Sequence, residues 1–161
     1  MIFLVVGEAG RLLANNLNSR RKELANLIYA LGLLKTELVY ADIFLGESLF
    51  RIGNAVAGEI GGLLVAAAKH LKDDSGCNGL LLALAEYRAS LPFREEEYEI
   101  IERLGSGLGT RDLESELRRI DYAVKSAEMA LSSATELQKK WGRVYGVGGW
   151  LCGLTAALFI L

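Results

Sequence analysis

The stretch from Asp112 to Trp141, DLESELRRIDYAVKSAEMALSSATELQKKW, repeats apolar residues at alternating spacings of four and three. This spacing places the apolar residues along one side of a helix, as in a coiled-coil seam. The seam residues are Leu113, Leu117, Ile120, Val124, Ala127, Leu131 and Ala134. We therefore predict a long helix over 112–141 whose apolar side packs inside a helical bundle.

The other side of this helix is predicted to face solvent, because acidic and basic residues recur four residues apart. Three pairs put the acid first, the favourable order along a helix: Glu114 with Arg118, Asp121 with Lys125, and Glu136 with Lys140. Arg118, Arg119 and Lys125 therefore lie on the predicted outer surface. We take these three residues as the candidate partner-binding residues.

The sequence before this stretch also shows helical spacing, with no alternating strand pattern. Leucine and isoleucine recur at three and four residues from Leu24 to Leu38, which predicts a helix over about 20–43. Further helices are predicted over 42–53, 58–71 and 78–89, and another opens at Ser90 and Pro92 and closes at Gly105 and Gly109. The fold class is therefore predicted as all-α, an antiparallel bundle of about six helices.

Residues 144–161, VYGVGGWLCGLTAALFIL, contain no charged side chain. As a helix this run is about 27 Å long, close to the thickness of a bilayer's hydrocarbon core of about 30 Å. We predict a transmembrane helix over 142–161. The alternative is the buried last helix of a soluble bundle.

Residues 1–18 form a second apolar segment, weakened by Glu8 and Arg11. Charges are unfavourable at the centre of a bilayer, so this segment is predicted to associate with the membrane or to span it weakly. Basic residues follow it at 20–22 and precede the second segment at 139–143. The positive-inside rule therefore predicts a cytoplasmic domain over 19–141.

Several classes of site have little support in the sequence. The net charge of −2, from 18 Lys and Arg against 20 Asp and Glu, argues against nucleic-acid binding. We predict no enzyme, no catalytic, metal or cofactor site, and no small-molecule substrate, because His70 is the only histidine and no nucleophile motif is present.

Two weaker alternatives remain open. Gly105 to Gly109 could hold a nucleotide phosphate, although a corner between two helices fits the glycine spacing better. Glu95, Glu99 and Glu102 could bind a cation, although a solvated first helical turn is the simpler interpretation.

One segment carries most of a resemblance to a known family, which typically has two leucine-glycine steps, then serine-aspartate, then a glutamine. The matching residues here are Leu104-Gly105, Leu108-Gly109 and Asp112, with Arg111 in place of the serine and Glu116 in place of the glutamine. A second segment, LKTELVY at 34–40, keeps the acidic residue Glu37 before a valine-tyrosine step. With the order of its parts, the chain resembles the stage III sporulation protein AB family.

This resemblance implies a helical domain similar to the cytoplasmic domains of type II secretion and type IV pilus platform proteins. It also implies a place in the mother-cell membrane facing the forespore, within a secretion-like complex of endospore-forming bacteria. The implied partners are an ATPase similar to stage III sporulation protein AA, other membrane subunits and membrane lipid. A different possibility is a tail-anchored adaptor or regulator that binds a soluble partner through the acidic residues from Glu95 to Glu102.

Overall fold

The computed structural model describes residues 2–40, 44–73, 78–109 and 112–160, with side chains described over 15–40, 44–72, 78–109 and 112–138. The described residues form six α-helices and no β-strand. The helices are α1 (Ile2–Tyr40), α2 (Leu45–Ala55), α3 (Gly58–Asp73), α4 (Gly79–Tyr87), α5 (Glu95–Gly105) and α6 (Leu113–Ile160). The prediction of an all-α fold with about six helices is confirmed.

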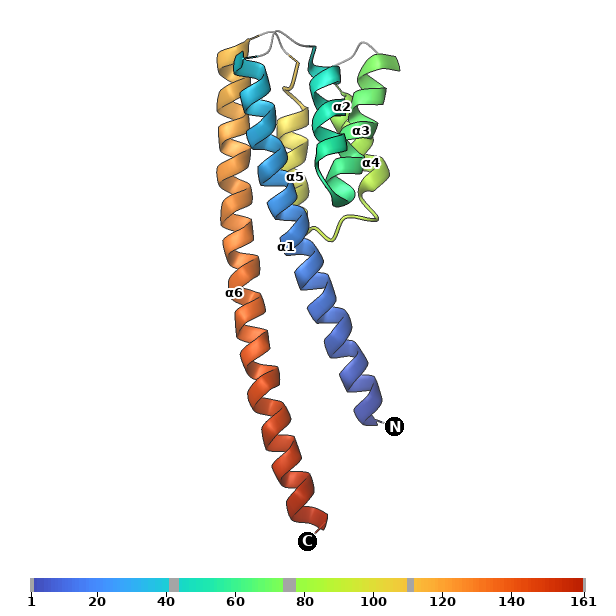
Figure 1. Ribbon diagram of the computed structural model, residues 1–161, viewed down its shortest axis with the longest axis vertical. Helices are drawn as coiled ribbons and strands as arrows, with labels where there is room; N and C mark the ends of the chain where they lie inside the picture. The colour runs from blue at the N-terminus through green and yellow to red at the C-terminus, as the bar shows by residue number, and fades with distance from the viewer. Residues whose placement is uncertain (1, 41–43, 74–77, 110–111, 161) are drawn as a thin grey trace.

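The two long helices, α1 and α6, lie side by side and run in opposite directions (Figure 1). The short helices α2, α3 and α4 pack against one another in chain order, with α2 and α3 also contacting α1. α5 follows them and packs against both α4 and α6. Because α1 and α6 extend past the short helices in the same direction, both chain termini lie at one end of the molecule (Figure 1).

The hydrophobic core is built around the apolar side of α1. Leu24, Leu27, Leu31 and Leu34 are buried, as their spacing predicts. Helices α2, α3, α5 and α6 contribute fully buried side chains to the same region: Leu49, Ile52, Ile60, Leu63, Ile101 and Ile120. Burying one such side chain contributes about 1.5–3 kcal/mol, so these contacts are a main source of the bundle's stability.

The first helix is much longer than predicted. The expected start near residue 20 is wrong, because α1 begins at Ile2 and runs without a break to Tyr40. Only a proline would remove a backbone N–H from the helical ladder, and the single proline of the chain is Pro92. α1 therefore crosses the predicted domain boundary at residue 18, and α6 crosses the one at residue 141 in the same way.

The two predicted membrane segments, 1–18 and 142–161, lie almost entirely outside the part of the chain whose side chains are described. Within the described residues, no helix combines the length and the apolar character that a membrane span requires.

The buried stripe of α6 differs in part from the predicted seam. Ile120, Ala127 and Ala134 are fully buried as predicted, whereas Leu113 is 46% exposed. Ala123 and Glu116 lie in the buried stripe as well. The buried stripe is wider than a seam between two helices, because α6 packs against both α1 and α5.

α2 packs closely on α3 where two glycines meet. A Cβ atom added to Gly61 would lie 2.1 Å from the carbonyl oxygen of Val56 and 2.8 Å from that of Gly53. A Cβ atom on Gly53 would in turn lie 2.8 Å from the carbonyl oxygen of Gly61. The backbones of α2 and α3 therefore approach to a distance that only residues without a side chain permit.

Candidate protein-docking site between α5 and α6

The first turn of α5 is capped by its own glutamate. The predicted start at Ser90 is wrong, because the Ser90 hydroxyl donates to the carbonyl of Tyr87 and the helix begins at Glu95. The carboxylate of Glu97 accepts a hydrogen bond of 2.7 Å from the backbone N–H of Arg94. This bond satisfies one of the N–H groups that every helix start leaves open.

The same carboxylate forms a buried ion pair with Arg20 of α1. The Nε atom of Arg20 donates to the two Glu97 oxygens at 2.9 and 3.1 Å, and its Nη2 atom donates to Oε1. Arg20 is 5% exposed and Glu97 is 1% exposed. The interpretation of residues 20–22 as one basic cluster at a membrane surface is therefore wrong for Arg20, whose charge is matched inside the protein.

The remaining acidic residues of α5 are in part already paired. Arg88 forms ion pairs with Glu95 and with Glu102, the latter at 3.0 Å, and its guanidinium carbon lies 4.6 Å from the centroid of the Tyr98 ring. Glu95 and Glu102, two of the three glutamates considered as a cation-binding site, are thus each paired with the guanidinium group of Arg88. Among the described residues, no three His, Cys, Asp or Glu side chains are grouped so that they could hold a metal ion.

The glycine-rich segment after α5 is a corner between two helices, as the glycine spacing predicts. α5 ends at Gly105, and Gly109 adopts a positive φ of 92° before α6 begins. The N–H of Gly109 donates a hydrogen bond of 2.8 Å to Glu116, which is buried in the first part of α6. At the start of α6 the Ser115 hydroxyl donates to Asp112 and lowers the pKa of that carboxyl.

Replacing Gly109 with valine is expected to destabilise the protein by at least about 1–2 kcal/mol, because side chains other than glycine are strained at positive φ. Asparagine tolerates this conformation better, so Gly109→Asn is the matched control and is expected to cost less. Urea denaturation followed by circular dichroism measures both. Equal stability of the valine variant and the wild type would contradict the geometric role of Gly109.

A cleft of about 270 Å³ lies between α5 and α6, just beyond this corner. Its lining combines apolar residues with three arginines: Ile100, Arg103, Leu104, Arg118, Arg119, Tyr122 and Ala123. The Nη1 atom of Arg103 donates to the Tyr122 hydroxyl at 3.2 Å, and its guanidinium carbon lies 5.5 Å from the ring centroid. Arginine guanidinium groups beside apolar side chains are well suited to bind the carboxylate groups of another protein.

Two of the three predicted partner-binding residues line this cleft. Arg118 lies 3.5 Å from Glu114, with side chains 71% and 79% exposed, so that pair contributes little. Arg119 extends over Gly107, where an added Cβ atom would lie 1.1 Å from its Nη1 atom. Arg118 and Arg119 therefore hold neighbouring positive charges at the cleft.

The third predicted residue, Lys125, is exposed but is not part of the cleft lining. The predicted pairing of Lys125 with Asp121 is wrong, because Asp121 forms an ion pair of 2.5 Å with Lys35 of α1. The predicted pairing of Glu136 with Lys140 lies outside the described side chains, because these end at residue 138.

Sequence reasoning missed Arg103 and Tyr122 as cleft residues. Tyr122 follows Arg118 by four residues, a spacing that puts both on one side of a helix and could have indicated a shared surface. Arg103 comes from α5, and nothing local in the sequence links it to α6. His70, the only histidine, lies in the last turn of α3 with its Nε2 atom 2.9 Å from Glu86.

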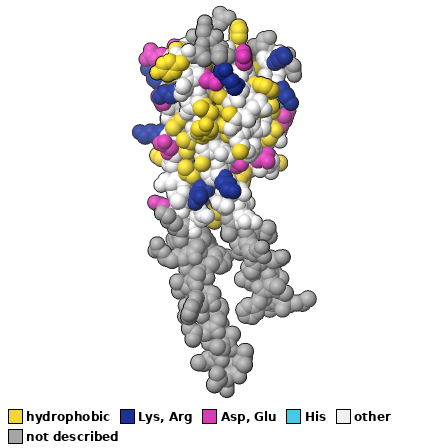
Figure 2. Space-filling view, in the orientation of Figure 1, with side chains coloured by type: hydrophobic (Ala, Val, Ile, Leu, Met, Phe, Trp, Pro, Cys, Tyr) yellow, Lys and Arg dark blue, Asp and Glu magenta, His cyan; other side chains and the backbone are white. Residues whose placement is uncertain are grey.

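Charges of both signs are interspersed on the face of the bundle that Figure 2 shows. Figure 2 shows apolar side chains gathered at the centre of one face and Lys, Arg, Asp and Glu residues spread around its edge. The low net charge of −2 agrees with this mixture. The surface offers local patches for a protein partner rather than a single basic field.

Comparisons with known proteins agree on one family. The family described as Stage III sporulation protein AB matches residues 1–161. A stage III sporulation protein AB from Bacillus subtilis (strain 168) is 25% identical over 164 residues, covering 99% of this chain and 96% of the relative. A solved structure of a stage III sporulation protein AB has the same fold, with a TM-score of 0.71 at 24% identity over 76% of this chain and 98% of that one. The chain therefore belongs to the stage III sporulation protein AB family.

Proposed function

We propose that the protein is a membrane platform component of a secretion-like channel complex that acts in endospore formation. Its membership of the stage III sporulation protein AB family supports the sporulation context. In this proposal residues 19–141 lie in the cytoplasm, at the mother-cell membrane facing the forespore. The protein links a cytoplasmic ATPase to the other membrane subunits and catalyses no reaction itself.

The arrangement of the two long helices supports attachment to a membrane. α1 and α6 leave the bundle at the same end (Figure 1). Segments 1–18 and 142–161 therefore extend in one direction, and the uncharged run at 144–161 has a helical length of about 27 Å. We propose 142–161 as the transmembrane helix and 1–18 as a weaker membrane segment beside it.

The arginine cleft between α5 and α6 is the observation that carries the proposed contact with the ATPase. Arg103, Arg118 and Arg119 present guanidinium groups beside the exposed ring of Tyr122. Arginine and tyrosine are enriched among residues that dominate binding at protein interfaces. We propose that an acidic segment of an ATPase similar to stage III sporulation protein AA docks here, with Lys125 at the edge.

The test combines Arg118→Glu, Arg119→Glu and Lys125→Glu in the full chain, reconstituted in lipid nanodiscs. Affinity for the ATPase is expected to fall at least about tenfold at low salt, because reversed charges slow encounter and weaken docking. The folded state should persist, because exposed charges of this kind contribute about 1 kcal/mol or less. Surface plasmon resonance measures binding, and a circular dichroism melt checks folding.

The matched control reverses three basic residues outside the cleft, Lys22, Lys35 and Arg51, which changes the net charge equally. Binding by this control is expected to stay within about twofold of the wild type, apart from the loss of general steering that high salt removes. Equal loss of binding in both triple variants would contradict docking at the cleft. A wild-type chain that binds no ATPase at any salt concentration would contradict the platform role.

A further inference from the structure

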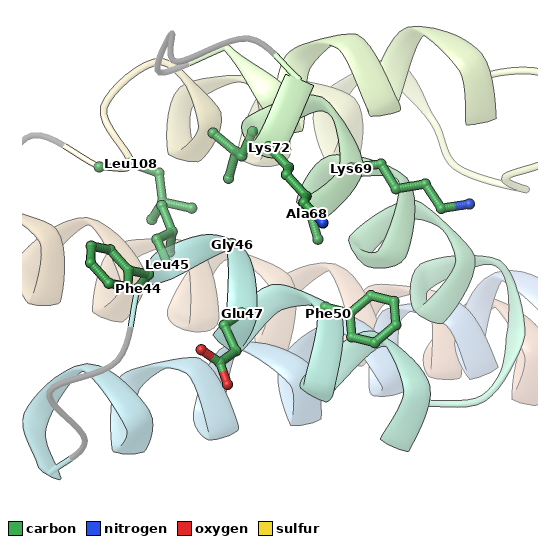
Figure 3. Close-up of a pocket in the computed structure, with 11 residues that line it drawn as sticks. Phe44, Leu45, Gly46, Glu47, Phe50, Ala68, Lys69, Lys72 and Leu108 are labelled. Atoms are coloured by element: carbon green, nitrogen blue, oxygen red, sulfur yellow. The ribbon is translucent and has the colours of Figure 1, made fainter.

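A second surface lies at the end of the bundle opposite to the chain termini, separate from the arginine cleft. There the first turns of α2 and the last turns of α3 enclose an open groove of about 720 Å³ (Figure 3). One wall runs from Phe44 to Phe50, and the other runs from Ala68 to Lys72. Leu108 and Gly109, from the corner before α6, complete the lining.

The groove exposes large apolar side chains to solvent. Phe44 is 87% exposed and Phe50 is 50% exposed, although phenylalanine has a large apolar side chain. Figure 3 shows their rings at opposite ends of the groove, with Leu108 beside Phe44. Exposed apolar residues clustered around a hollow indicate a surface that another molecule covers.

The shape and chemistry of the groove favour a helix over a small ligand. Sites for small ligands have a few buried polar groups that converge on the ligand. The charged residues of this groove, Glu47, Lys69 and Lys72, are all exposed at its edges. Phe44 is the residue just before α2, and Phe50 follows it by six residues, or about 9 Å of helical rise. A bound helix spans nearly the same distance, about 10 Å, between apolar residues at positions i and i+7.

The charged residues around the groove indicate which charge a bound helix should carry. Lys69 and Lys72 project from the same wall, and neither forms an ion pair with a described residue. Glu47 lies in the first turn of α2, where the helix dipole favours an acid, and Figure 3 shows it on the side away from the lysines. The α3 wall is therefore positively charged and complements carboxylates.

We propose that this groove binds an amphipathic helix of another protein, with large apolar residues at i, i+4 and i+7 and acidic residues beside them. The apolar residues contact Phe44 and Phe50. The acidic residues contact Lys69 and Lys72. This surface is independent of the arginine cleft, and the proposal stands or falls separately from the docking of the ATPase.

Two designed peptides test the proposal against the full chain in phosphatidylcholine nanodiscs. Both are fluorescein-labelled 18-residue helices with leucine at i, i+4 and i+7; one carries glutamates beside the leucines and the other carries lysines. The acidic peptide is expected to bind at least about tenfold tighter than the basic peptide in fluorescence anisotropy, with empty nanodiscs as the blank. The combined variant Lys69→Glu and Lys72→Glu is expected to reverse that preference.

Phe50→Ser is expected to weaken both peptides about tenfold, because it removes apolar contact without changing charge. Tyr29→Ser, at a residue of α1 that is 58% exposed and outside the groove, is the matched control and should change neither affinity. A circular dichroism melt verifies that each variant is folded. Equal binding of the two peptides, no binding of either, or an unchanged preference in the double-lysine variant would overturn the proposal. So would a dimer of the wild type that Phe50→Ser dissociates, which would assign the groove to a second copy.

Discussion

Replacing Glu97 with alanine is expected to destabilise the protein by about 3–5 kcal/mol, because it leaves the buried guanidinium of Arg20 without a counter-charge. The substitution also removes the hydrogen bond that Glu97 accepts from the backbone of Arg94 at the start of α5. For a chain of this size the midpoint of a thermal melt is expected to fall by roughly 10 °C. Far-UV circular dichroism of the full chain measures the change.

A double replacement tests whether the uncompensated charge is the cause. The Nη1 atom of Arg20 is buried and has no hydrogen-bond partner among the described residues, so even the native pair is incompletely satisfied. Arg20→Met combined with Glu97→Met is therefore expected to be more stable than Glu97→Ala alone.

The control is an ion pair of the same type at the surface. Lys35 and Asp121 also join two helices, but their side chains are 43% and 56% exposed. Lys35→Ala is expected to cost about 1 kcal/mol or less, because solvent screens exposed pairs. A loss from Glu97→Ala no larger than that from Lys35→Ala would show that burial of the Arg20 pair does not matter.

The Gly61→Ala variant is expected to lose about 1–3 kcal/mol or more, because the added methyl group has no space. Its Cβ atom would lie 2.1 Å from the Val56 carbonyl oxygen, which is part of the backbone and moves only if α2 and α3 separate. Separation would also weaken the burial of neighbouring core residues of both helices. Urea denaturation of the full chain measures the loss.

Gly32→Ala is the matched control, with the same chemical change and the opposite expected sign. A Cβ atom at Gly32 would meet nothing within 4 Å, and Gly32 lies in the interior of α1. Alanine there is expected to stabilise the helix by about 0.5–1 kcal/mol. A neutral Gly61→Ala variant would contradict the close packing of α2 on α3, and a destabilised Gly32→Ala variant would contradict the open space at Gly32.

Local spacing predicted the helices well, because the repeat of three and four residues is a property of one helix alone. It identified the buried leucines of α1, and the spacing of the glycines indicated the corner from Gly105 to Gly109, where the structure gives Gly109 a positive φ. Boundaries were less predictable. α1 begins at Ile2, because weak helix-forming residues remain helical where neither proline nor a competing turn interrupts the backbone.

The charged contacts could not be predicted from local spacing. Arg20 and Glu97 are 77 residues apart, and Lys35 and Asp121 are 86 residues apart. A basic cluster and an acidic helix start each have a sufficient local explanation, so neither indicates its partner. For the same reason the sequence located Arg118 and Arg119 on an outer surface but did not bring Arg103 to them.

The sequence by itself thus determined the fold class, most of the helices, the apolar side of α1 and, through two short segments, the family. The tertiary structure alone decided which charges are buried, which arginines share a cleft, and where α2 and α3 leave two phenylalanines exposed beside lysines. The physical reason is the distance along the sequence over which each property is determined. Helix formation depends on residues within about one turn of each other, whereas burial depends on how distant helices rotate and pack against one another.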